Sequence, residues 1–290
     1  MSHATGSERI TFIIPAFNEE GVGEVVRELR RIHPGAPVIV VDDGSQDRTA
    51  EIAREAGAEV VRHPYNKGNG AAVKTGLRNV RTDLLVLLDA DGQHPPQDAA
   101  RLIAKLEEFD LVIGARDAKA EVYWWRRMAN AAYNWLASYL TGFPVPDLTS
   151  GFRAARRGPM LEFLHLYPNG FSYPTTSTLS FLRGGYNVAF VPITMRLRAH
   201  GKSKIRLIHD GSRFFLIILK MITLYNPLKV FVPLSLFFAA AGTGYGLWAF
   251  WVSGRFANGA LLAWMMATFV FLVGLISEQI NALRMERRKD

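Results

Sequence analysis

The stretch Leu84-Leu-Val-Leu-Leu-Asp-Ala-Asp-Gly-Gln93 decides the fold of the N-terminal part of this 290-residue chain. Its uninterrupted apolar start is typical of a strand that is buried on both faces of a sheet. Short apolar or β-branched runs recur at Ile10–Pro15, Val38–Asp42, Glu59–Arg62, Leu84–Asp89 and Leu111–Gly114. Stretches with helical periodicity separate them, at Val22–Ile32, Thr49–Ala56, Gly70–Val80 and Pro96–Phe109. The alternation predicts an α/β fold, a mostly parallel sheet with flanking helices.

Polar residues follow the predicted strands at their carboxyl ends, which is where ligands bind in parallel α/β sheets. They are Asn18-Glu19-Glu20, Asp42-Asp43-Gly44-Ser45 and Asp89-Ala-Asp-Gly-Gln93. Because residues two apart point the same way on an extended chain, Asp89, Asp91 and Gln93 can converge on one cation. Their oxygen atoms suit Mg²⁺ or Mn²⁺, which hold diphosphates and leave positions open for substrate. A solvated acidic turn is the alternative, but the acidic end of a second strand favours a functional site.

The charged residues are distributed unevenly, with 34 Lys and Arg, 26 Asp and Glu, and a net charge of +8. Residues 230–277 contain only one of them, Arg255, so a charged globular part precedes an apolar tail. From Arg196 to Lys229 there are eight cations against one acid, Asp210. The basic excess therefore lies beside the apolar tail and does not indicate a nucleic-acid partner. The absence of cysteine excludes disulfides, thiolate metal sites and thiol nucleophiles.

Two apolar runs, Leu228–Val252 and Ala260–Ser277, each approach the ~20 residues that a helix needs to cross a bilayer. Buried helices of soluble proteins usually show a polar face, and these runs show none. We expect a transmembrane hairpin with spans of about 228–252 and 260–282. Both flanks are more basic than the connecting loop, which places them in the cytoplasm. Met1–Glu8 lacks the apolar core of a signal peptide, so we expect a cytoplasmic N-terminal part and an integral plasma-membrane protein.

These patterns predict three parts: a cytoplasmic domain over residues 1–204, amphipathic interface helices over 205–227, and the hairpin with a basic tail over 228–290. Gly242-x-x-x-Gly246 permits close helix approach, so a homo-oligomer formed through these glycines is a hypothesis. A further aromatic segment either fills the core or sits at the lipid interface, and the sequence leaves both possibilities open. Its aromatic residues are Trp124, Trp125, Tyr133, Trp135 and Tyr139.

Two common nucleotide-binding motifs are not indicated. The G-x-G-x-x-G of dinucleotide-binding folds should follow the first strand, where Pro15-Ala-Phe-Asn-Glu19 stands. Gly201-Lys202-Ser203 has the end of a P-loop, but Arg196 occupies the place of its first glycine. The sequence therefore favours neither hydride transfer nor ATP hydrolysis.

Seven segments in order resemble those of a family 2 glycosyltransferase of GT-A fold. Within that family they are most similar to the dolichol-phosphate mannose synthase group of polyprenyl-phosphate glycosyltransferases. The segments are Ile13-Ile-Pro-Ala-Phe-Asn-Glu19, Val41-Asp-Asp-Gly-Ser45 with Asp47-Arg-Thr49, Asn66-Lys-Gly-Asn-Gly70, Leu88-Asp-Ala-Asp-Gly-Gln-His-Pro-Pro96, Gly114-Ala-Arg116, Asp147-Leu-Thr-Ser-Gly-Phe-Arg153 and Arg198-Ala-His-Gly-Lys-Ser-Lys204. They cover about residues 10–204. The resemblance implies a glycosyltransferase with the GT-A fold.

The resemblance also implies roles for individual residues. The nucleotide sugar would be bound by Pro15, Phe17, Glu19, Asp42, Asp43, Asp89 and Ala90. The metal would be bound by Asp89, Asp91 and Gln93, and the catalytic set would be Asp91, Arg116, Arg126 and Arg198. The acceptor phosphate would be bound by Arg116, Arg126, Asn130, Ser150, Arg198, Lys202 and Lys204. Relatives can carry Ser in place of Asn130 and an acidic residue in place of Lys202.

The implied chemistry needs a divalent cation and positively charged side chains. A sugar that leaves a nucleoside diphosphate develops negative charge on the diphosphate, which Mg²⁺ or Mn²⁺ stabilises. A polyprenyl or dolichyl phosphate is already an anion, so cations that position it matter more than a general base. We expect inverting transfer of one hexose on the cytoplasmic leaflet, with mannose from GDP-mannose favoured and a UDP-sugar such as UDP-glucose as the alternative.

Two other functions are less consistent with the sequence. A processive polysaccharide synthase should carry a Gln-x-x-Arg-Trp motif and more membrane spans. A non-catalytic membrane scaffold has no need for the intact residues Asp89, Asp91 and Arg116.

Overall fold

The computed structural model describes residues 9–116, 124–170, 172–196 and 226–286, with backbone alone at 124–126 and 284–286. The chain divides into two compact units, Met1–Ile205 and Arg206–Asp290, and each is described by itself. Arg198, Lys202, Lys204 and the interface helices expected over 205–227 lie outside the described residues. The side chain of Arg126 also lies outside them.

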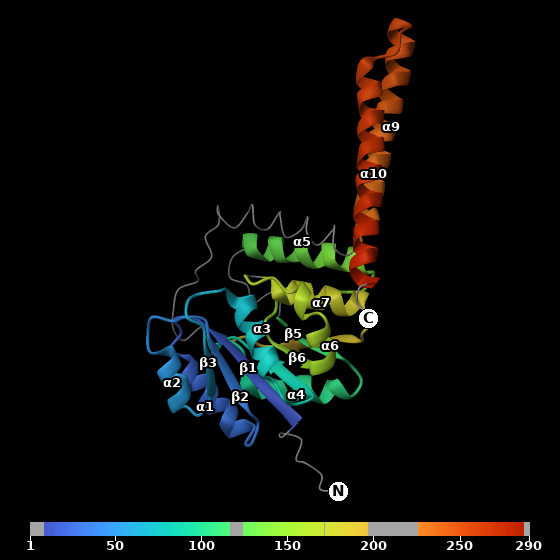
Figure 1. The fold of residues 1–290 in the computed structure, drawn as a ribbon. Coiled ribbons are helices and arrows are strands. Elements are labelled where there is room, and N and C mark those ends of the chain that lie inside the picture. The colour runs from blue at the N-terminus through green and yellow to red at the C-terminus, as the bar shows by residue number, and fades with distance from the viewer. Residues whose placement is uncertain (1–8, 117–123, 171, 197–225, 287–290) are drawn as a thin grey trace. The chain divides into compact units, whose positions relative to one another are not determined.

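The first unit is built on a seven-stranded sheet with the order β3-β2-β1-β4-β6-β5-β7 (Figure 1). Strands β1 to β4 run parallel to one another, and β5 is parallel to β7, whereas β6 runs antiparallel to both of its neighbours, β4 and β5. The strands are β1 Ile10–Ala16, β2 Val38–Asp42, β3 Glu59–Arg62, β4 Leu84–Leu87, β5 Leu111–Arg116, β6 Arg153–Arg156 and β7 Val188–Ile193. The five strands expected from the sequence are confirmed, and two more complete the sheet.

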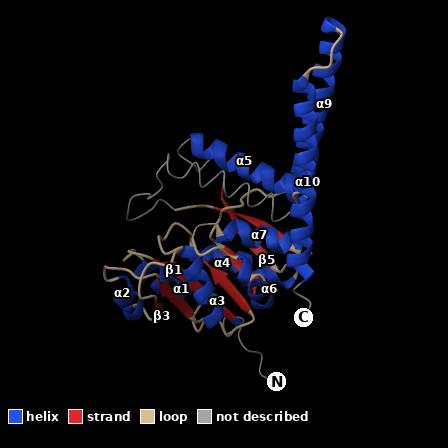
Figure 2. Cartoon of the chain, turned by 45° about the horizontal axis from the view of Figure 1, so that its top comes forward, coloured by secondary structure: helices blue, strands red, loops and turns tan. Residues whose placement is uncertain are grey.

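Helices cover both faces of the sheet, because alternate residues of each strand point to opposite sides (Figure 2). Phe12 and Ile14 of β1 pack with α1, α2 and α4, whereas Ile13 packs with α3, α6 and α7. The helices are α1 Val22–Ile32, α2 Thr49–Glu55, α3 Asn69–Asn79, α4 Ala99–Ala104, α5 Trp124–Thr141, α6 Arg157–Glu162 and α7 Tyr173–Arg183, with single 3₁₀ turns at η2 Pro96–Asp98, η3 Lys105–Glu107 and η5 Leu164–Leu166. The mixed sheet with flanking helices confirms the expected fold class.

The glycines of Asn66-Lys-Gly-Asn-Gly70 allow the loop before α7 to lie against the start of α3. The amide of Gly70 donates to the carbonyl oxygen of Gly170 at 3.1 Å, and that of Ala71 donates to Asn169 at 2.9 Å. A Cβ atom on Gly70 would collide with the carbonyl oxygen of Pro168. This motif therefore joins two parts of the domain that are distant in sequence. The backbone amides in the first turn of α3 donate hydrogen bonds within the protein.

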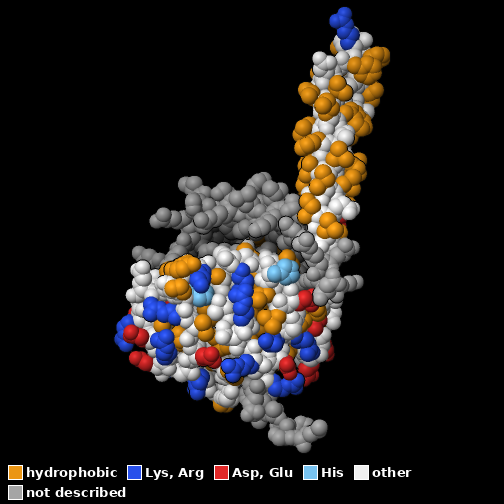
Figure 3. Space-filling model, viewed as in Figure 1, with side chains coloured by type: hydrophobic (Ala, Val, Ile, Leu, Met, Phe, Trp, Pro, Cys, Tyr) orange, Lys and Arg blue, Asp and Glu red, His pale blue; other side chains and the backbone are white. Residues whose placement is uncertain are grey.

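The second unit is a helical hairpin of α9 (Leu228–Ser253) and α10 (Asn258–Glu286). Both helices are long and apolar enough to cross a membrane, over Leu228–Ser253 and Asn258–Leu283. Figure 3 shows hydrophobic side chains along the hairpin surface, while charged side chains gather on the first unit. The structure therefore agrees with the two apolar spans expected from the sequence.

Gly242 and Gly246 pack inside this hairpin. A Cβ atom on Gly242 would lie 3.0 Å from Cβ of Ala263, and one on Gly246 would lie 3.1 Å from Cβ of Ala260. Both glycines are buried against α10. The sequence suggested that these glycines mediate self-association. In the structure they pack against α10 of the same chain.

Candidate active site

A cavity of about 650 Å³ opens where the loops after β1, β2 and β3 meet. Its volume lies in the range of small-molecule sites, which is about 300–1,000 Å³. Of the residues expected at the nucleotide, Phe17 lines the cavity, whereas Pro15 is buried within β1. The complete lining is Phe17, Gly44, Ser45, Gln46, Arg62, His63, Pro64, Tyr65 and Asn66.

Hydrogen bonds between side chains and backbone amides join the first two loops. The amide of Asn18 donates to Oγ of Ser45, and the amide of Gln46 donates to Oδ1 of Asn18, both at 2.9 Å. The amide of Glu19 donates to Oγ1 of Thr49 at 2.9 Å. Glu19, which was expected at the nucleotide, therefore lies in a loop whose backbone is held by hydrogen bonds to the segment that follows β2.

Asp42 lies below the cavity and is fully buried. Its Oδ1 accepts from the amide of Ser45 at 2.9 Å, and its Oδ2 lies 3.1 Å from Nε of Arg62. Nη2 of Arg62 also donates to the carbonyl oxygen of Ser45 at 2.7 Å. Because Arg62 lines the cavity, the buried carboxylate of Asp42 orients a cation at the cavity wall.

Asp43 organises the far wall of the cavity. Its carboxylate accepts from the amides of Lys67 at 2.9 Å and Gly68 at 2.8 Å. Nδ1 of the buried His63 donates to it at 2.7 Å, and Nε2 of His63 lies 2.9 Å from Oγ1 of Thr75 on α3. Asp43 was expected to touch the nucleotide, and the structure shows its carboxylate bound to the loop that lines the pocket.

Sequence reasoning missed His63. The signal was present, because His63 is the polar residue that directly follows β3, the neighbour of β2 in the sheet. A polar residue at the carboxyl end of a parallel strand is a candidate for the site by the same rule that selected Asp42 and Asp89.

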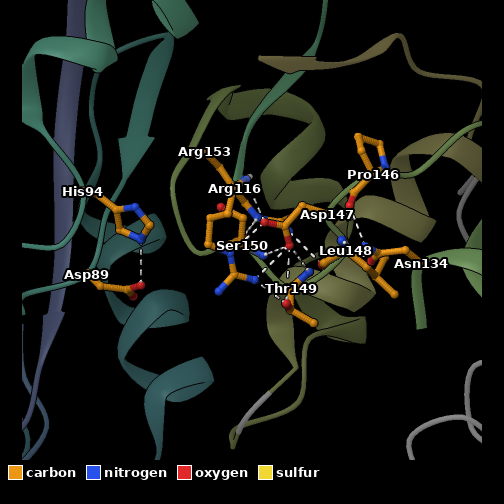
Figure 4. Close-up of polar contacts among 10 residues, drawn as sticks. All are labelled: Asp89, His94, Arg116, Asn134, Pro146, Asp147, Leu148, Thr149, Ser150 and Arg153. Atoms are coloured by element: carbon orange, nitrogen blue, oxygen red, sulfur yellow. Dashed lines mark hydrogen bonds and ion pairs between the residues drawn. The ribbon is translucent and has the colours of Figure 1, made fainter. Parts of the chain in front are cut away.

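The expected metal-binding residues follow β4. Oδ2 of Asp89 accepts from Nε2 of His94 at 3.2 Å (Figure 4). Oδ1 of Asp91 accepts from the amide of Gln93 at 3.1 Å. Ala90 between them is buried. His94 is buried as well and stacks on Phe152, with ring centroids 5.3 Å apart. His94 therefore holds Asp89 in place.

The chain also packs tightly against Asp89 from the other side. A Cβ atom on Gly151 would lie 2.7 Å from Oδ2 of Asp89, so only glycine fits at this position. Burial alone raises the pKa of Asp89, but the hydrogen bond with His94 and the positive charges of His94 and Arg116 outweigh this, and the pKa lies below its usual value. Asp89 is held as a carboxylate, the form that binds a cation.

The residues after β4 fit a divalent cation that shares its ligands with a substrate. In the described part of the chain, no group of three or more His, Cys, Asp or Glu side chains could hold a metal alone. Asp89 and Asp91 provide carboxylates and Gln93 an amide oxygen, all on partly exposed chain. Mg²⁺ and similar ions are often held by one or two carboxylates, with phosphate and water oxygens completing the coordination.

Arg116 ends β5 and is bound by Asp147 (Figure 4). Its Nε donates to Oδ2 of Asp147 at 2.7 Å, and its Nη2 donates to Oδ1 at 2.9 Å and to Oγ1 of Thr149 at 2.6 Å. Burial alone would raise the pKa of Asp147. The hydrogen bonds and positive charge of Arg116 lower it by more, so the pKa of Asp147 lies below its usual value. The guanidinium expected to handle phosphate is thus oriented by a carboxylate.

Arg153 is the second positive charge beneath this loop, and it is fully buried in β6. Its donors reach the carbonyl oxygen of Ser150 at 2.7 Å, Oγ of Ser177 at 2.7 Å and Oγ1 of Thr178 at 2.8 Å. Burial lowers the pKa of Arg153 to about 10. Arg153 joins the Asp147–Ser150 turn to α7, a role that the sequence did not predict.

Two other residues expected at the acceptor phosphate, Ser150 and Asn130, have described side chains. Ser150 is buried, and its hydroxyl has no hydrogen-bond partner in the described structure. Asn130 is half-buried on α5. Arg196, counted among the cations beside the apolar tail, instead donates to Glu28 at 2.8 and 3.0 Å and to Gln97 at 2.8 Å. Its charge is therefore matched by Glu28 within the domain.

Comparison with known proteins identifies the class to which this fold and site belong. Residues 11–163 match the model of glycosyl transferase family 2, and residues 226–283 match that of the GtrB C-terminal hairpin. The chain belongs to glycosyl transferase family 2 and carries a GtrB-type hairpin. It is a glycosyltransferase.

Two relatives in sequence and one solved structure of similar fold show what the chain is similar to. The chain is 29% identical to glycosyltransferase AglJ of Haloferax volcanii, over 97% of each chain. It is 33% identical to the polyprenol monophosphomannose synthase of Mycolicibacterium smegmatis, over 68% of this chain and 81% of the relative. Its fold resembles glucosyl-3-phosphoglycerate synthase of Mycobacterium tuberculosis, crystallised with Mn²⁺, UDP and glucosyl-3-phosphoglycerate, with a TM-score of 0.60 and 22% identity over 77% and 85% of the two chains.

Proposed function

We propose that this protein transfers one hexose, with inversion, from a nucleotide sugar to a polyprenyl or dolichyl phosphate at the cytoplasmic leaflet. One observation carries the proposal. The carboxylates after β4 and the arginine-bearing loop of Arg116 and Asp147 adjoin in a chain that also carries two apolar helices of membrane-spanning length. Similarity to the polyprenol monophosphomannose synthase of M. smegmatis supports a polyprenol phosphate acceptor and mannose as the sugar. The resemblance of the sequence to the dolichol-phosphate mannose synthase group makes GDP-mannose our first choice of donor. A UDP-sugar such as UDP-glucose is the second.

The donor half would hold the nucleotide in the cavity beside Phe17 and the Asp42–Arg62 pair. Asp89, Asp91 and Gln93 would bind Mg²⁺ or Mn²⁺ at the diphosphate, and Ala90 would contact the sugar. When bound, the cation would stabilise the negative charge that develops on the leaving diphosphate. Pro15, Glu19 and Asp43 would support this half through the loops that they fix.

The acceptor half would hold the lipid phosphate by Arg116, Arg126, Asn130, Ser150, Arg198, Lys202 and Lys204. An oxygen of this phosphate attacks C1 of the hexose, the bond from C1 to the diphosphate breaks, and the nucleoside diphosphate leaves. Inversion follows from a single displacement. A phosphate dianion has no proton to lose, so the residues need to position and desolvate it but not to deprotonate it.

We also propose the membrane arrangement. The catalytic domain over residues 1–204 and both termini would be cytoplasmic, 205–227 would form interface helices, and the hairpin over 228–290 would span the plasma membrane. The basic flanks of the two spans support this orientation.

The direct test is a transfer assay with the full chain in vesicles that contain a polyprenyl phosphate. Radiolabelled GDP-mannose and UDP-glucose are supplied separately with Mg²⁺ or Mn²⁺, and labelled lipid is measured. We expect lipid labelling that needs the cation and favours GDP-mannose. Labelling from UDP-glucose alone would select the second donor, and no labelled lipid from any donor of a wider GDP- and UDP-sugar panel would overturn the proposal.

A further inference from the structure

Three side chains from separate segments form a closed polar cluster at the end of the loop proposed to bind the metal, residues 89–97, which we call the metal loop. They are Glu28 of α1, Gln97 of η2 and Arg196 after β7, and they lie 69 to 168 positions apart in sequence. Nη1 and Nη2 of Arg196 donate to the two carboxylate oxygens of Glu28 at 2.8 and 3.0 Å. Nη2 also donates to Oε1 of Gln97 at 2.8 Å, and Nε2 of Gln97 donates to Oε1 of Glu28 at 2.6 Å. The cluster therefore ties the segment after β7 to α1 and to the metal loop.

The geometry of this cluster suits an arginine. A planar guanidinium can pair with both oxygens of a carboxylate and still offer a donor to a third group, whereas a lysine ammonium is a point charge. The hydrogen bond from Arg196 is the largest effect on the pKa of Glu28, which lies below its usual value although burial acts in the opposite direction. Exposed ion pairs add little to the stability of a fold, and the side chain of Arg196 is 45% exposed. The pair is therefore better explained by the chain that it positions than by a gain in stability.

Arg196 also contacts the metal loop through its backbone. Its amide donates to the carbonyl oxygen of Gln93 at 2.9 Å. The amide of Gln93 in turn donates to Oδ1 of Asp91 at 3.1 Å. Two prolines, which have no amide hydrogen to donate, stand between Gln93 and Gln97. Arg196 therefore holds the loop at two points, the backbone of Gln93 and the side chain of Gln97, on either side of a stretch that is poor in backbone donors.

We propose that Arg196 is a positioning residue for the divalent cation, because it holds the metal loop in the conformation that presents Asp91 and Gln93. On the inner side of the loop, the ring of His94 is buried in the domain. The Arg196 cluster holds the outer side, where Gln97 is exposed. This inference rests on the proposed function, in which the metal loop binds Mg²⁺ or Mn²⁺. Groups that hold a metal ligand without touching the metal commonly change metal affinity by roughly 10- to 100-fold when they are replaced.

Nucleotide affinity, measured with and without the cation, tests this role without sugar transfer. GDP and UDP are each titrated by calorimetry into the full chain in detergent micelles, first with a chelator and then with saturating Mn²⁺. In the parent, Mn²⁺ should tighten the binding of at least one nucleotide, because the cation joins the metal loop to the diphosphate. In Arg196→Gln we expect this gain in affinity from Mn²⁺ to fall roughly tenfold, while the affinity in chelator stays that of the parent.

Arg156→Gln is the matched control for this titration. The side chain of Arg156 is 43% exposed and pairs with Asp110. Arg156 lies opposite Leu84, at the start of β4, whereas the metal loop follows the other end of that strand. Its gain in affinity from Mn²⁺ should equal that of the parent. Arg196→Lys keeps the charge without the planar fork, so it should restore part of the gain that Arg196→Gln loses.

Two results of the titration would overturn the positioning role. One is a parental gain from Mn²⁺ in Arg196→Gln. The other is an equally weakened affinity of Arg196→Gln with and without Mn²⁺, which would indicate a general defect of the domain. Failure of the proposed function looks different, because the parent itself would then show no gain from Mn²⁺ with either nucleotide, and the metal site and this inference would be overturned together.

A kinetic measurement separates positioning from participation in the reaction. In Arg196→Gln, the Mn²⁺ concentration that gives half the maximal transfer rate should rise roughly tenfold. The rate at saturating Mn²⁺ should stay close to that of the parent, because the cation then fills the site in both proteins. A lower saturated rate with an unchanged Mn²⁺ requirement would contradict the inference and would assign Arg196 to the reaction itself.

Discussion

The two halves of the site hold their carboxylates with partners from different places in the chain. In the donor half, Asp42 and Asp43 lie at the end of β2, and their side-chain partners Arg62 and His63 lie at the end of the neighbouring strand β3. In the acceptor half, the cation Arg116 ends β5, and its partner Asp147 comes from a loop 31 residues further along the chain. Backbone amides add to the hydrogen bonds of the carboxylates in both halves. Each half therefore depends on a pair of side chains, so one substitution can test each half separately.

Loss of Asp91, the proposed metal-binding carboxylate, should have the largest effect on activity, because in the proposed reaction both halves act at the diphosphate. Asp91→Asn should lower the transfer rate by about 100-fold or more, the order expected when a ligand to a catalytic cation is lost. The assay is labelled lipid per unit time. Asp98→Asn, which changes a carboxylate of a nearby surface pair, should keep the parental rate. A parental rate for Asp91→Asn would remove the metal site from the mechanism.

Arg116→Gln should impair use of the lipid phosphate without changing nucleotide binding. A charge-assisted hydrogen bond contributes about 1.5–3 kcal/mol, so kcat/KM for the lipid phosphate should fall roughly 10- to 100-fold. The affinity for the nucleoside diphosphate, measured by calorimetry, should not change. The control is Arg101→Gln, which removes a guanidinium from a surface pair. An equal loss of nucleotide affinity would mean that the two halves are not separate.

Arg153→Met tests whether the buried cation acts by position. The change removes four hydrogen bonds from Arg153 to oxygen atoms of the turn and of α7. Buried oxygen atoms that are left without a hydrogen-bond donor should lower the free energy of unfolding by about 2 kcal/mol. Where the variant folds, KM for the acceptor should rise while KM for the donor does not. Arg54→Met on the exposed side of α2 is the control, and Arg153→Lys should restore part of the loss.

His63→Phe tests the corresponding positioning role in the donor half. It keeps a ring of similar size but removes the hydrogen bonds to Asp43 and Thr75, which should loosen the loop that lines the cavity. We expect donor KM to rise about five- to tenfold, the effect of roughly one hydrogen bond, with acceptor KM unchanged. His165→Phe at an exposed position controls for loss of a histidine. A change in acceptor KM would contradict the assignment of His63.

The smallest expected effect is a pH dependence of stability in the acceptor half. The pKa of Asp147 is lowered in the folded protein, so this group binds a proton more readily in the unfolded chain. Its contribution to stability is present above the ordinary carboxyl pKa of about 4 and is lost as pH falls through the lower folded value. Thermal unfolding of the parent and of Asp147→Asn should therefore converge as pH falls below about 4. A difference that stays constant would show that the ion pair does not contribute.

The strands β1 to β5 were predictable because each contains apolar residues that favour strands. The strand Arg153-Ala-Ala-Arg156 was not predictable. Like β3 it has a charged residue at each end, but the middle of β3 is Val60-Val61, whereas the middle of β6 is two alanines, which do not favour a strand. The expected hairpin is borne out for the same reason as the strands: long apolar runs have few ways to fold. The docking of Gly68 and Gly70 onto residues 168–170 was not predictable, because it joins segments about 100 residues apart.

Local pattern therefore determined the α/β alternation, the apolar hairpin and the position of the carboxylates at the strand ends. These features depend on neighbours in the chain, through side-chain alternation and hydrophobicity. Only the tertiary structure decided which partner each charge has: Asp43 binds His63 and two loop amides, Arg116 binds Asp147, and Arg196 binds Glu28. Such pairings join residues that are far apart in the sequence. Their energies depend on distance and burial in three dimensions, which no short stretch of sequence contains.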